Sequence, residues 1–244
     1  MMEIKCVLAR IGTWIDDLLF PQEVTCLCCD HALSAEDEDN LCVGCRRELA
    51  RLAEKQEKRE AGGAEPFPEG IDALHAAFVY EGAVRRLVHR LKYESVRAAA
   101  VPLAMQMVFL PSGEEEIIVP VPTDPKRERR RGFNQSALLA EHIGRELGMQ
   151  VERALVRREA RRPQTGLTGE ERRKNLTGCM AVSKAVSGRR VLLVDDVVTT
   201  GATVQEAARA LRAAGAKGIR VFAAARAAGN PDAVKDPFEM VQSR

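Results

Sequence analysis

The residues best suited to chemistry lie in one stretch of the chain, Val191 to Thr203. An apolar run there ends in two adjacent carboxylates, Asp195 and Asp196, and a turn of small and hydroxyl residues follows, Thr199-Thr200-Gly201-Ala202-Thr203. Threonine hydroxyls and the backbone N–H groups that open a helix can donate to a phosphate, and glycine permits a positive φ. Adjacent carboxylates repel each other unless they accept from hydroxyl groups or face a divalent cation. A sugar phosphate with a diol meets both demands.

The elements that must position this stretch have the pattern of a parallel sheet. Val191 to Asp195 reads as a buried strand, Val204 to Ala214 as a helix that closes at Gly215, and Ile219 to Ala225 as the next strand. A β-α-β unit of this length predicts parallel pairing, and ligands of such sheets gather beyond the carboxyl ends of the strands. The stretch lacks the lysine of a G-x-x-x-x-G-K-[ST] loop, which disfavours a nucleoside triphosphate, and G-x-G-x-x-G is absent as well.

This combination of an apolar strand, an acidic pair and Thr-Thr-Gly-x-Thr is similar to the binding motif of type I phosphoribosyltransferases. The ligand of that family is 5-phosphoribosyl-1-pyrophosphate (PRPP). The resemblance implies that Thr199 to Thr203 hold the 5-phosphate, while Asp195 and Asp196 accept from the ribose hydroxyls. The plainer alternative is an ordinary buried strand followed by a capped helix, but apolar burial alone requires neither the acidic pair nor the threonines.

A second group of chemically active residues is a set of cysteines near the start of the chain. Cys26 and Cys29 form one C-x-x-C pair, and Cys42 and Cys45 form another. Two such pairs can present four thiolates to one tetrahedral ion, which predicts structural Zn²⁺ because four thiolates leave no position for water. Disulfide bonds are the alternative, which a reducing compartment disfavours. Cys28 and His31 are alternative ligands, although only Cys26 has the correct spacing to Cys29 and His31 has no partner at metal spacing.

Charge divides the chain near residue 70. Residues 1–70 carry eight Lys and Arg against fifteen Asp and Glu, whereas residues 71–244 carry 29 against 20. With the Gly- and Pro-rich segment Ala61 to Gly70, this predicts an N-terminal helix plus zinc-ribbon module over residues 1–62 and a second domain over residues 71–244. No apolar run approaches the ~18 residues of a membrane span, and the N-terminus has no signal-peptide pattern, so we expect a cytoplasmic protein.

A basic segment follows another predicted strand, Ile117 to Pro122. Five cations lie within six residues of the expected loop Thr123 to Gly132, and the predicted site residues among them are Lys126, Arg127 and Arg131. Asn134 then caps a helix that Gly148 closes, and a further strand ends at Leu155 and Val156, which would complete another β-α-β unit. Beside the phosphate turn, these cations suit a pyrophosphate group. A solvent-exposed basic run and a nucleic-acid contact are the alternatives.

Several blocks resemble the ComF (GntX-like) subgroup of the phosphoribosyltransferases. They are Val-Pro-Val-Pro with the later Arg-Gly-Phe-Asn-Gln135, the Lys92-Tyr93 pair that closes a helix, and Arg-x-x-Pro-Gln followed by Glu-Arg-x-x-Asn. On periodicity alone, His89 and Lys92 are expected on a solvated helix face. The resemblance makes Gln164, Arg172 and Asn175 candidate residues of a segment that closes over PRPP. It also implies a parallel α/β sheet with flanking helices, in which the zinc ribbon replaces the variable hood on the acceptor side.

Two functions therefore follow from the sequence. The first is transfer of the phosphoribosyl group from magnesium-bound PRPP to an unidentified acceptor, with Asp195 and Asp196 holding the ribose ring as positive charge develops on it. The second is a PRPP-responsive or nucleic-acid-binding accessory role in DNA uptake, with single-stranded DNA or uptake proteins as partners, since the resembled subgroup is associated with competence. The aromatic content of 4% argues against a stacking platform for single strands. The sequence is compatible with an oligomer.

Overall fold

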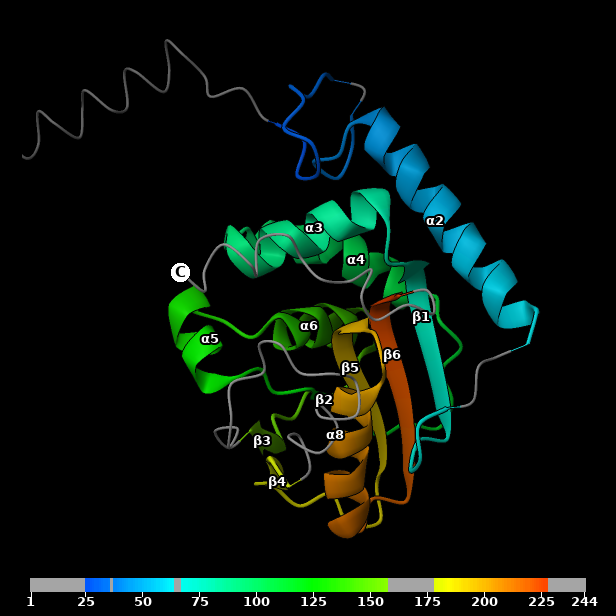
Figure 1. The fold of residues 1–244 in the computed structure, drawn as a ribbon, viewed down its shortest axis with the longest axis vertical. Helices are drawn as coiled ribbons and strands as arrows, with labels where there is room; N and C mark the ends of the chain where they lie inside the picture. The colour runs from blue at the N-terminus through cyan, green and yellow to red at the C-terminus, as the bar shows by residue number, and fades with distance from the viewer. Residues whose placement is uncertain (1–24, 36, 64–66, 158–177, 228–244) are drawn as a thin grey trace, which may run out of the picture.

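The computed structural model describes residues 25–35, 37–63, 67–157 and 178–227, and its ribbon is shown in Figure 1. In chain order the helices and strands are α2 (Val43–Ala61), β1 (Ala73–Val79), α3 (Gly82–Tyr93), the 3₁₀ helix η1 (Arg97–Ala99), α4 (Ala100–Met107), β2 (Ile117–Pro120), α5 (Pro125–Arg131), α6 (Gln135–Leu147), β3 (Leu155–Arg157), β4 (Met180–Val182), β5 (Arg190–Val198), α8 (Ala202–Ala213) and β6 (Gly218–Arg226).

The centre of the fold is a four-stranded sheet in the order β1-β6-β5-β2, in which every neighbouring pair is parallel. The predicted fold class, a parallel sheet flanked by helices, is therefore confirmed. Because β5 pairs with both β6 and β2, the segments that follow β5 and β2 leave the sheet at the same edge and side by side. The phosphate turn and the basic segment are thus neighbours, as the sequence predicts for adjacent strands.

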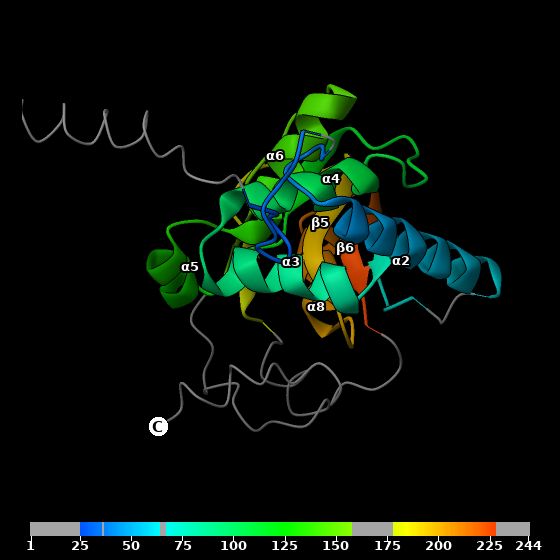
Figure 2. The ribbon, with the colours of Figure 1, turned by 90° about the horizontal axis from the view of Figure 1, so that it is seen from above.

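Side chains of β5 alternate between two apolar layers, as expected for a strand that is covered on both faces. Leu192 and Val194 pack with residues of α3, α4 and α6, whereas Val191 and Leu193 pack with residues of α8. Seen from above, α4 and α6 lie on one side of the sheet and α8 lies on the other (Figure 2). At the edge of the sheet, α2 covers β1.

The first difference from the sequence prediction is the length of β5. The strand continues past Asp195 and Asp196 to Val198 because its backbone stays paired with β6, up to Val198 opposite Arg226. The acidic pair therefore lies inside the last part of the strand, and only the threonine turn lies beyond its end.

The second difference is the basic segment, which is largely helical instead of the expected loop. Asp124 caps α5 by accepting from the backbone N–H groups of Lys126 and Arg127, Pro125 occupies the first turn, and Gly132 ends the helix with φ 79°. These are strong start and stop signals for a helix. The next helix, α6, begins at the predicted cap Asn134 and ends before Gly148.

The third difference concerns Leu155 and Val156, which were expected to continue a β-α-β unit. Only Val151 bridges to Ile118 of the main sheet in parallel, and the chain then turns away. Leu155 and Val156 belong to β3, which pairs antiparallel with β4 in a separate two-stranded sheet. Within the part of the chain that the structure describes, no helix is both long enough and apolar enough to cross a membrane.

Candidate active site and metal centre

Asp195 and Asp196 form the centre of the candidate active site. Asp195 is buried, and its Oδ1 accepts from the hydroxyl of Ser136 (3.0 Å) and from the backbone N–H of Asp196 (2.9 Å). Burial and the neighbouring charge of Asp196 raise the pKa of Asp195 to about 7, although these hydrogen bonds oppose the shift. Adjacent residues of a strand point to opposite faces, so the two carboxyl groups have different surroundings.

Asp196 has a cationic partner from a distant element. The ammonium group of Lys92, near the end of α3, lies 3.0 Å from Asp196 Oδ2. Exposed fractions are 23% for the Lys92 side chain and 13% for that of Asp196, so water screens this pair only partly. The expectation that Lys92 lies on a solvated helix face is therefore wrong, and the lysine belongs to the site.

The threonine turn lies at the start of α8. Gly201 is the N-cap of this helix with φ 75°, and the hydroxyl of Thr200 accepts weakly from the backbone N–H of Ala202 at 3.4 Å. A Cβ atom at Gly201 would lie 2.7 Å from Cγ of Pro68, so the glycine is required by both backbone conformation and space. The N–H groups that open α8 are suited to an anion.

These groups surround a polar cavity of about 250 Å³ at the carboxyl ends of the central strands. Its lining residues come from α3, α5, α6, β3, β5 and α8 and from the segments that follow β1, β2 and β5. They are Tyr80, Lys92, Tyr93, Val121, Pro122, Thr123, Arg127, Arg131, Gln135, Ser136, Arg157, Asp195, Asp196, Val197, Thr199 and Thr203. The cavity thus combines hydroxyl donors, the acidic pair and four cations. Such a set can bind a sugar that carries phosphate groups.

Two arginines of the cavity each have a buried Nε donor that makes no hydrogen bond among the described residues. Arg131 is only 8% exposed, and its guanidinium lies 5.6 Å from the ring centre of Tyr93. Burial lowers the pKa of Arg131, and the charge of Asp196 opposes this shift. The Nε atoms of Arg131 and Arg157 are buried and make no hydrogen bond among the described residues. Because buried donors are normally paired, both atoms are suited to an anionic ligand.

The structure brings some predicted site residues together and not others. Asp195, Asp196, Thr199, Thr203, Arg127 and Arg131 line the cavity, and Thr200, Gly201 and Ala202 form the turn beside it. Lys126 is exposed and does not line it. Gln164, Arg172 and Asn175 lie outside the described residues. The sequence prediction missed Lys92, Ser136 and Arg157, of which only Lys92 carried a signal, the resembled Lys-Tyr pair.

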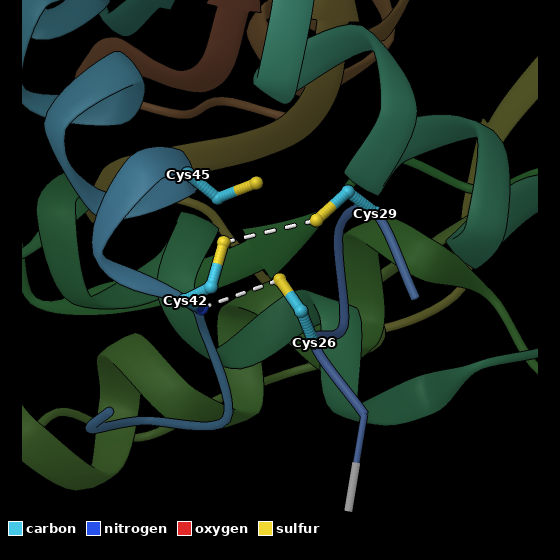
Figure 3. A group of neighbouring side chains, drawn as sticks. All are labelled: Cys26, Cys29, Cys42 and Cys45. Carbon is cyan, nitrogen blue, oxygen red and sulfur yellow. Dashed lines mark hydrogen bonds between the residues drawn. The ribbon is translucent and has the colours of Figure 1, made fainter. Parts of the chain in front are cut away.

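The four predicted cysteine ligands form a second site, shown in Figure 3. The Sγ atoms of Cys26, Cys29, Cys42 and Cys45 all lie within 4.8 Å of one another, and those of Cys29 and Cys42 are 3.7 Å apart. Zinc–sulfur bonds of about 2.3 Å place tetrahedral thiolates roughly 3.8 Å apart, so the cluster has the size that zinc needs. Cys28 lies outside this set, as its spacing predicts.

Backbone amides support the thiolate form of one ligand. The N–H groups of Cys28 and Cys42 point at Cys26 Sγ from 3.4 and 3.3 Å. Burial raises the pKa of the Cys26 thiol, but these donors outweigh burial and the pKa falls to about 7. Burial and the neighbouring thiols raise the pKa of Cys45. Crowded thiols of this kind are relieved when a cation binds and displaces their protons.

Comparison with known proteins identifies the family. The family described as "Phosphoribosyl transferase domain" matches residues 134–244. Competence protein F of Haemophilus influenzae is 39% identical over 167 residues, which cover 66% of this chain and 70% of that protein. The chain belongs to the ComF family of the phosphoribosyltransferase superfamily.

Other ComF relatives extend the match. DNA utilization protein YhgH of Escherichia coli (strain K12) is 34% identical, and the match covers 60% of this chain and 69% of that protein. Competence protein ComFC of Streptococcus pneumoniae is 27% identical over 238 residues, which cover 91% of this chain and all of that protein. Among solved structures, the chain is similar to glutamine PRPP amidotransferase from B. subtilis with a TM-score of 0.39 and 21% identity, over 53% of this chain and 26% of that one.

Proposed function

We propose that this ComF-family protein binds PRPP in the cavity beside Asp195 and Asp196 and transfers its phosphoribosyl group to an acceptor in the cytoplasm. The observation that carries the proposal is the composition of that one cavity. A single space of about 250 Å³ is lined by three kinds of polar group. They are the hydroxyl groups of Thr199 and Thr203, the acidic pair, and the cations Lys92, Arg127, Arg131 and Arg157. PRPP carries a 5-phosphate, a ribose diol and a pyrophosphate, for which these groups are complementary.

In this proposal each part of the cavity holds one part of PRPP. The turn from Thr199 to Thr203 and the start of α8 receive the 5-phosphate. Asp195 and Asp196 accept from the ribose hydroxyls, and the arginines of α5 and β3 face the pyrophosphate. We retain Gln164, Arg172 and Asn175 as candidate ligands on the evidence of the sequence alone.

The proposed reaction breaks the bond between C1 of the ribose and the pyrophosphate oxygen. The electron pair leaves with pyrophosphate, a nucleophilic atom of the acceptor bonds to C1 from the opposite face, and the acceptor loses a proton to solvent. A magnesium ion bound to the pyrophosphate would neutralise part of the charge on the leaving group. The chain itself contributes cations around the leaving pyrophosphate and two carboxylates near the positive charge that develops on the ring.

We propose that the four-cysteine cluster holds one structural Zn²⁺. Four thiolates fill a tetrahedral coordination sphere and leave no position for water or substrate, so the ion would stabilise the module and take no part in transfer. The support is the mutual distance of the four Sγ atoms, all within 4.8 Å.

The test of PRPP binding uses the double variant Asp195→Asn with Asp196→Asn. Loss of two charge-assisted acceptors should weaken binding of the magnesium complex of PRPP by about 100-fold, whereas inorganic phosphate, which would occupy only the turn, should bind as before. Calorimetry measures both. Glu141→Gln, an acid-to-amide change at an exposed partner of Arg153, is the matched control. Equal PRPP affinity in the double variant and the control would refute the assignment.

Transfer is tested separately by release of pyrophosphate from PRPP in the presence of bases, amines and nucleic acids. A stimulated release with one class identifies the acceptor. Tight binding without release in any mixture would instead favour the accessory function described below.

The second candidate function is a nucleic-acid-binding accessory role in DNA uptake. The observation that favours it is the exposure of Lys126, Arg129 and Arg130 on α5, together with relatives named for competence and DNA utilization. Cations on one exposed helix are suited to a phosphate backbone. Such binding would be compatible with PRPP in the cavity, because these three side chains do not line it.

A further inference from the structure

Helix α3 lies between the cysteine module, residues 25–35 and 37–61, and the candidate PRPP site. It contacts the module from Ala83 to Arg90, and its last two residues line the site. It has twelve residues, Gly82–Tyr93, so it is about 18 Å long at 1.5 Å per residue. Five of its side chains, those of Ala83, Val84, Leu87, Val88 and Leu91, are buried. In Figure 1 the blue segment that precedes α2 lies above this helix. A helix held along its length in a packed core moves as one body.

The module contacts the first turns of α3 through polar atoms that come from beside the metal ligands. Cys28, between two of the ligands, has its Sγ 3.6 Å from the carbonyl oxygen of Ala83 and accepts from Nε of Arg86 at 3.4 Å. Glu48, one turn after Cys45 in α2, pairs with Arg86 at 2.6 Å and accepts from the backbone N–H of Ala83 at 3.1 Å.

The start of α3 lies close to Glu48. Gly82 has φ 45°, which favours glycine, and a Cβ atom there would displace the carboxylate of Glu48 from its present position. One helical turn after Arg86, Arg90 pairs with Asp30, which directly follows the ligand Cys29. The first C-x-x-C knuckle thus contacts α3 through Cys28 and the adjacent Asp30, and the helix that follows the second knuckle contacts it through Glu48.

The charges at these contacts predict how metal binding changes their strength. A divalent ion held by four thiolates carries roughly two net negative charges. The positive end of the α3 dipole and the guanidinium of Arg86 both face the knuckles, and so does that of Arg90. Filling the cluster with metal therefore strengthens the attraction that holds α3 in place, in the manner of the outer partners of other metal sites.

The far end of α3 supplies two residues of the cavity. Lys92 lies 3.0 Å from Asp196 Oδ2, and Tyr93 lies under the guanidinium of Arg131. Both line the space in which PRPP is proposed to bind. A shift or tilt of α3 would separate Lys92 from Asp196 and leave a carboxylate pair without its cation.

We propose that the metal-loaded cysteine module positions Lys92 and Tyr93 for PRPP through α3, with Arg86 and Glu48 as the positioning residues. The inference rests on PRPP binding as proposed above. It requires that metal binding and PRPP binding are coupled, and such coupling must act with the same factor in both directions.

The first experiment measures that reciprocity on the full chain. Zinc affinity is determined by competition with a chromogenic chelator, with and without the magnesium complex of PRPP, and we expect PRPP to tighten zinc binding by about 5-fold or more. Lys92→Met should bind zinc as the wild type does when PRPP is absent, because Lys92 pairs with Asp196 of β5 and not with the module, but should lose the tightening. Zinc affinity that does not respond to PRPP in the wild type would overturn the inference.

The second experiment keeps the module folded by holding zinc at saturation. Arg86→Gln should weaken PRPP binding by about 5-fold or more, and Arg86→Lys, which keeps the charge but not the planar fork, should restore part of the affinity. Lys55→Gln is the matched control, since Lys55 pairs with Glu81 beside the start of α3 but reaches no thiolate. Equal PRPP affinity in Arg86→Gln and Lys55→Gln would overturn the inference and leave the proposed function intact. If the wild type binds no PRPP at all, both the inference and the proposed function are refuted.

Discussion

Asp195 has a buried carboxyl group whose nearest charged neighbours come from two different elements. Asp196 beside it on β5 and burial together raise its pKa to about 7, whereas the ammonium of Lys92 on α3 and the hydrogen bond from Ser136 on α6 act in the opposite direction. The unfolded chain has no such environment, and there the carboxyl group ionises near its usual pKa of about 4. The folded state therefore holds a proton on Asp195 at pH values where the unfolded state has lost it.

This difference in bound protons determines how the free energy of unfolding changes with pH. Between about pH 4 and pH 7 the native state binds more protons than the unfolded state, so Asp195 lowers the free energy of unfolding progressively as pH rises, and the effect levels off above pH 7. We expect the stability of Asp195→Asn relative to the wild type to increase from pH 5 to pH 8, by at most about 3 kcal/mol, since one pKa unit is about 1.4 kcal/mol. Urea denaturation of both proteins at the two pH values measures this difference.

Comparing the two proteins at each pH cancels the contribution that other titrating groups make to the stability. Glu60 is one such group: burial raises its pKa, but hydrogen bonds from His75 and from a backbone N–H outweigh burial and lower it. A stability difference that is the same at pH 5 and pH 8 would show that Asp195 ionises in the native state at its ordinary pKa.

The sequence identified the acidic pair and the threonines because these residues lie within one short stretch of the chain. Lys92 and Ser136 could not be found in that way. Lys92 lies about a hundred positions before Asp196, and its place in the site depends on how α3 packs in the buried cluster that it shares with Leu192 and Phe222. Helical periodicity indicates which side of α3 is apolar, but not which polar residue at its end meets another element.

At the scale of elements, α5 was predicted as a loop although its sequence contains the residues that begin and end a helix. Asp124, Pro125 and Gly132 are ordinary start and stop residues of a helix, yet the run of cations between them favoured a loop. The helix has a consequence for binding, because it turns Arg127 and Arg131 toward the cavity while Arg129 and Arg130 are not part of its lining. Of the three cations that the sequence predicted as site residues, Lys126 is the one that does not line the cavity.

This division predicts different effects for two arginine variants of α5. Arg127→Gln should weaken binding of PRPP by roughly 10- to 100-fold, the usual cost of removing a hydrogen bond to a charged group, and should leave ribose 5-phosphate unaffected. Arg129→Gln with Arg130→Gln, made on the same helix, should bind PRPP as the wild type does. Calorimetric titration with the two ligands distinguishes the variants.

The same double variant tests the accessory function. If α5 binds single-stranded DNA, neutralising Arg129 and Arg130 should reduce the slope of log affinity against log salt concentration by about 0.7 for each DNA phosphate that the helix no longer neutralises. A double variant that loses PRPP affinity and keeps its DNA affinity would contradict the division of roles along α5.

Strand ends were the least predictable part of the sheet. β5 was expected to end with the first aspartate, because polar residues usually mark a turn, but pairing with β6 carries it three residues further to Val198. The segment around Leu155 was expected beside β2, yet only Val151 bridges to that strand. In both places backbone partners that are distant in the sequence decide the outcome, and a local pattern contains no information about them.

At the scale of the whole molecule, the cysteine module and the sheet share one apolar layer. Leu41, Leu49 and Leu52 of the module pack in the same buried cluster as residues of α3 and Phe222 of β6. The division into residues 1–62 and 71–244 remains a prediction from charge and composition. A module of so few residues has little apolar surface of its own to bury, so its order should depend on metal and on its contact with α3.

We therefore expect Cys42→Ser to lower the zinc content from about one ion per chain to near zero and to unfold the module. The reason is that three thiolates no longer close the tetrahedral sphere, and the free energy of metal binding is part of the folding free energy of so small a unit. Metal analysis of the purified protein gives the occupancy, and hydrogen exchange of residues 25–63 reports the unfolding. The strands β2, β5 and β6 should remain protected, because α4, α6 and α8 cover them, whereas β1 should lose the part of its protection that α2 provides.

Cys28→Ala is the matched control for this prediction, since Cys28 belongs to the same knuckle but lies outside the group of four Sγ atoms. It should retain its zinc, and any effect should be confined to the contacts of Cys28 with Ala83 and Arg86 on α3. Full zinc occupancy in both Cys42→Ser and Cys45→Ser would contradict the four-thiolate site. Loss of zinc in Cys28→Ala together with full occupancy in Cys26→Ala would place Cys28 in the coordination sphere, and the link between metal and α3 would then be direct coordination instead of contact through Arg86.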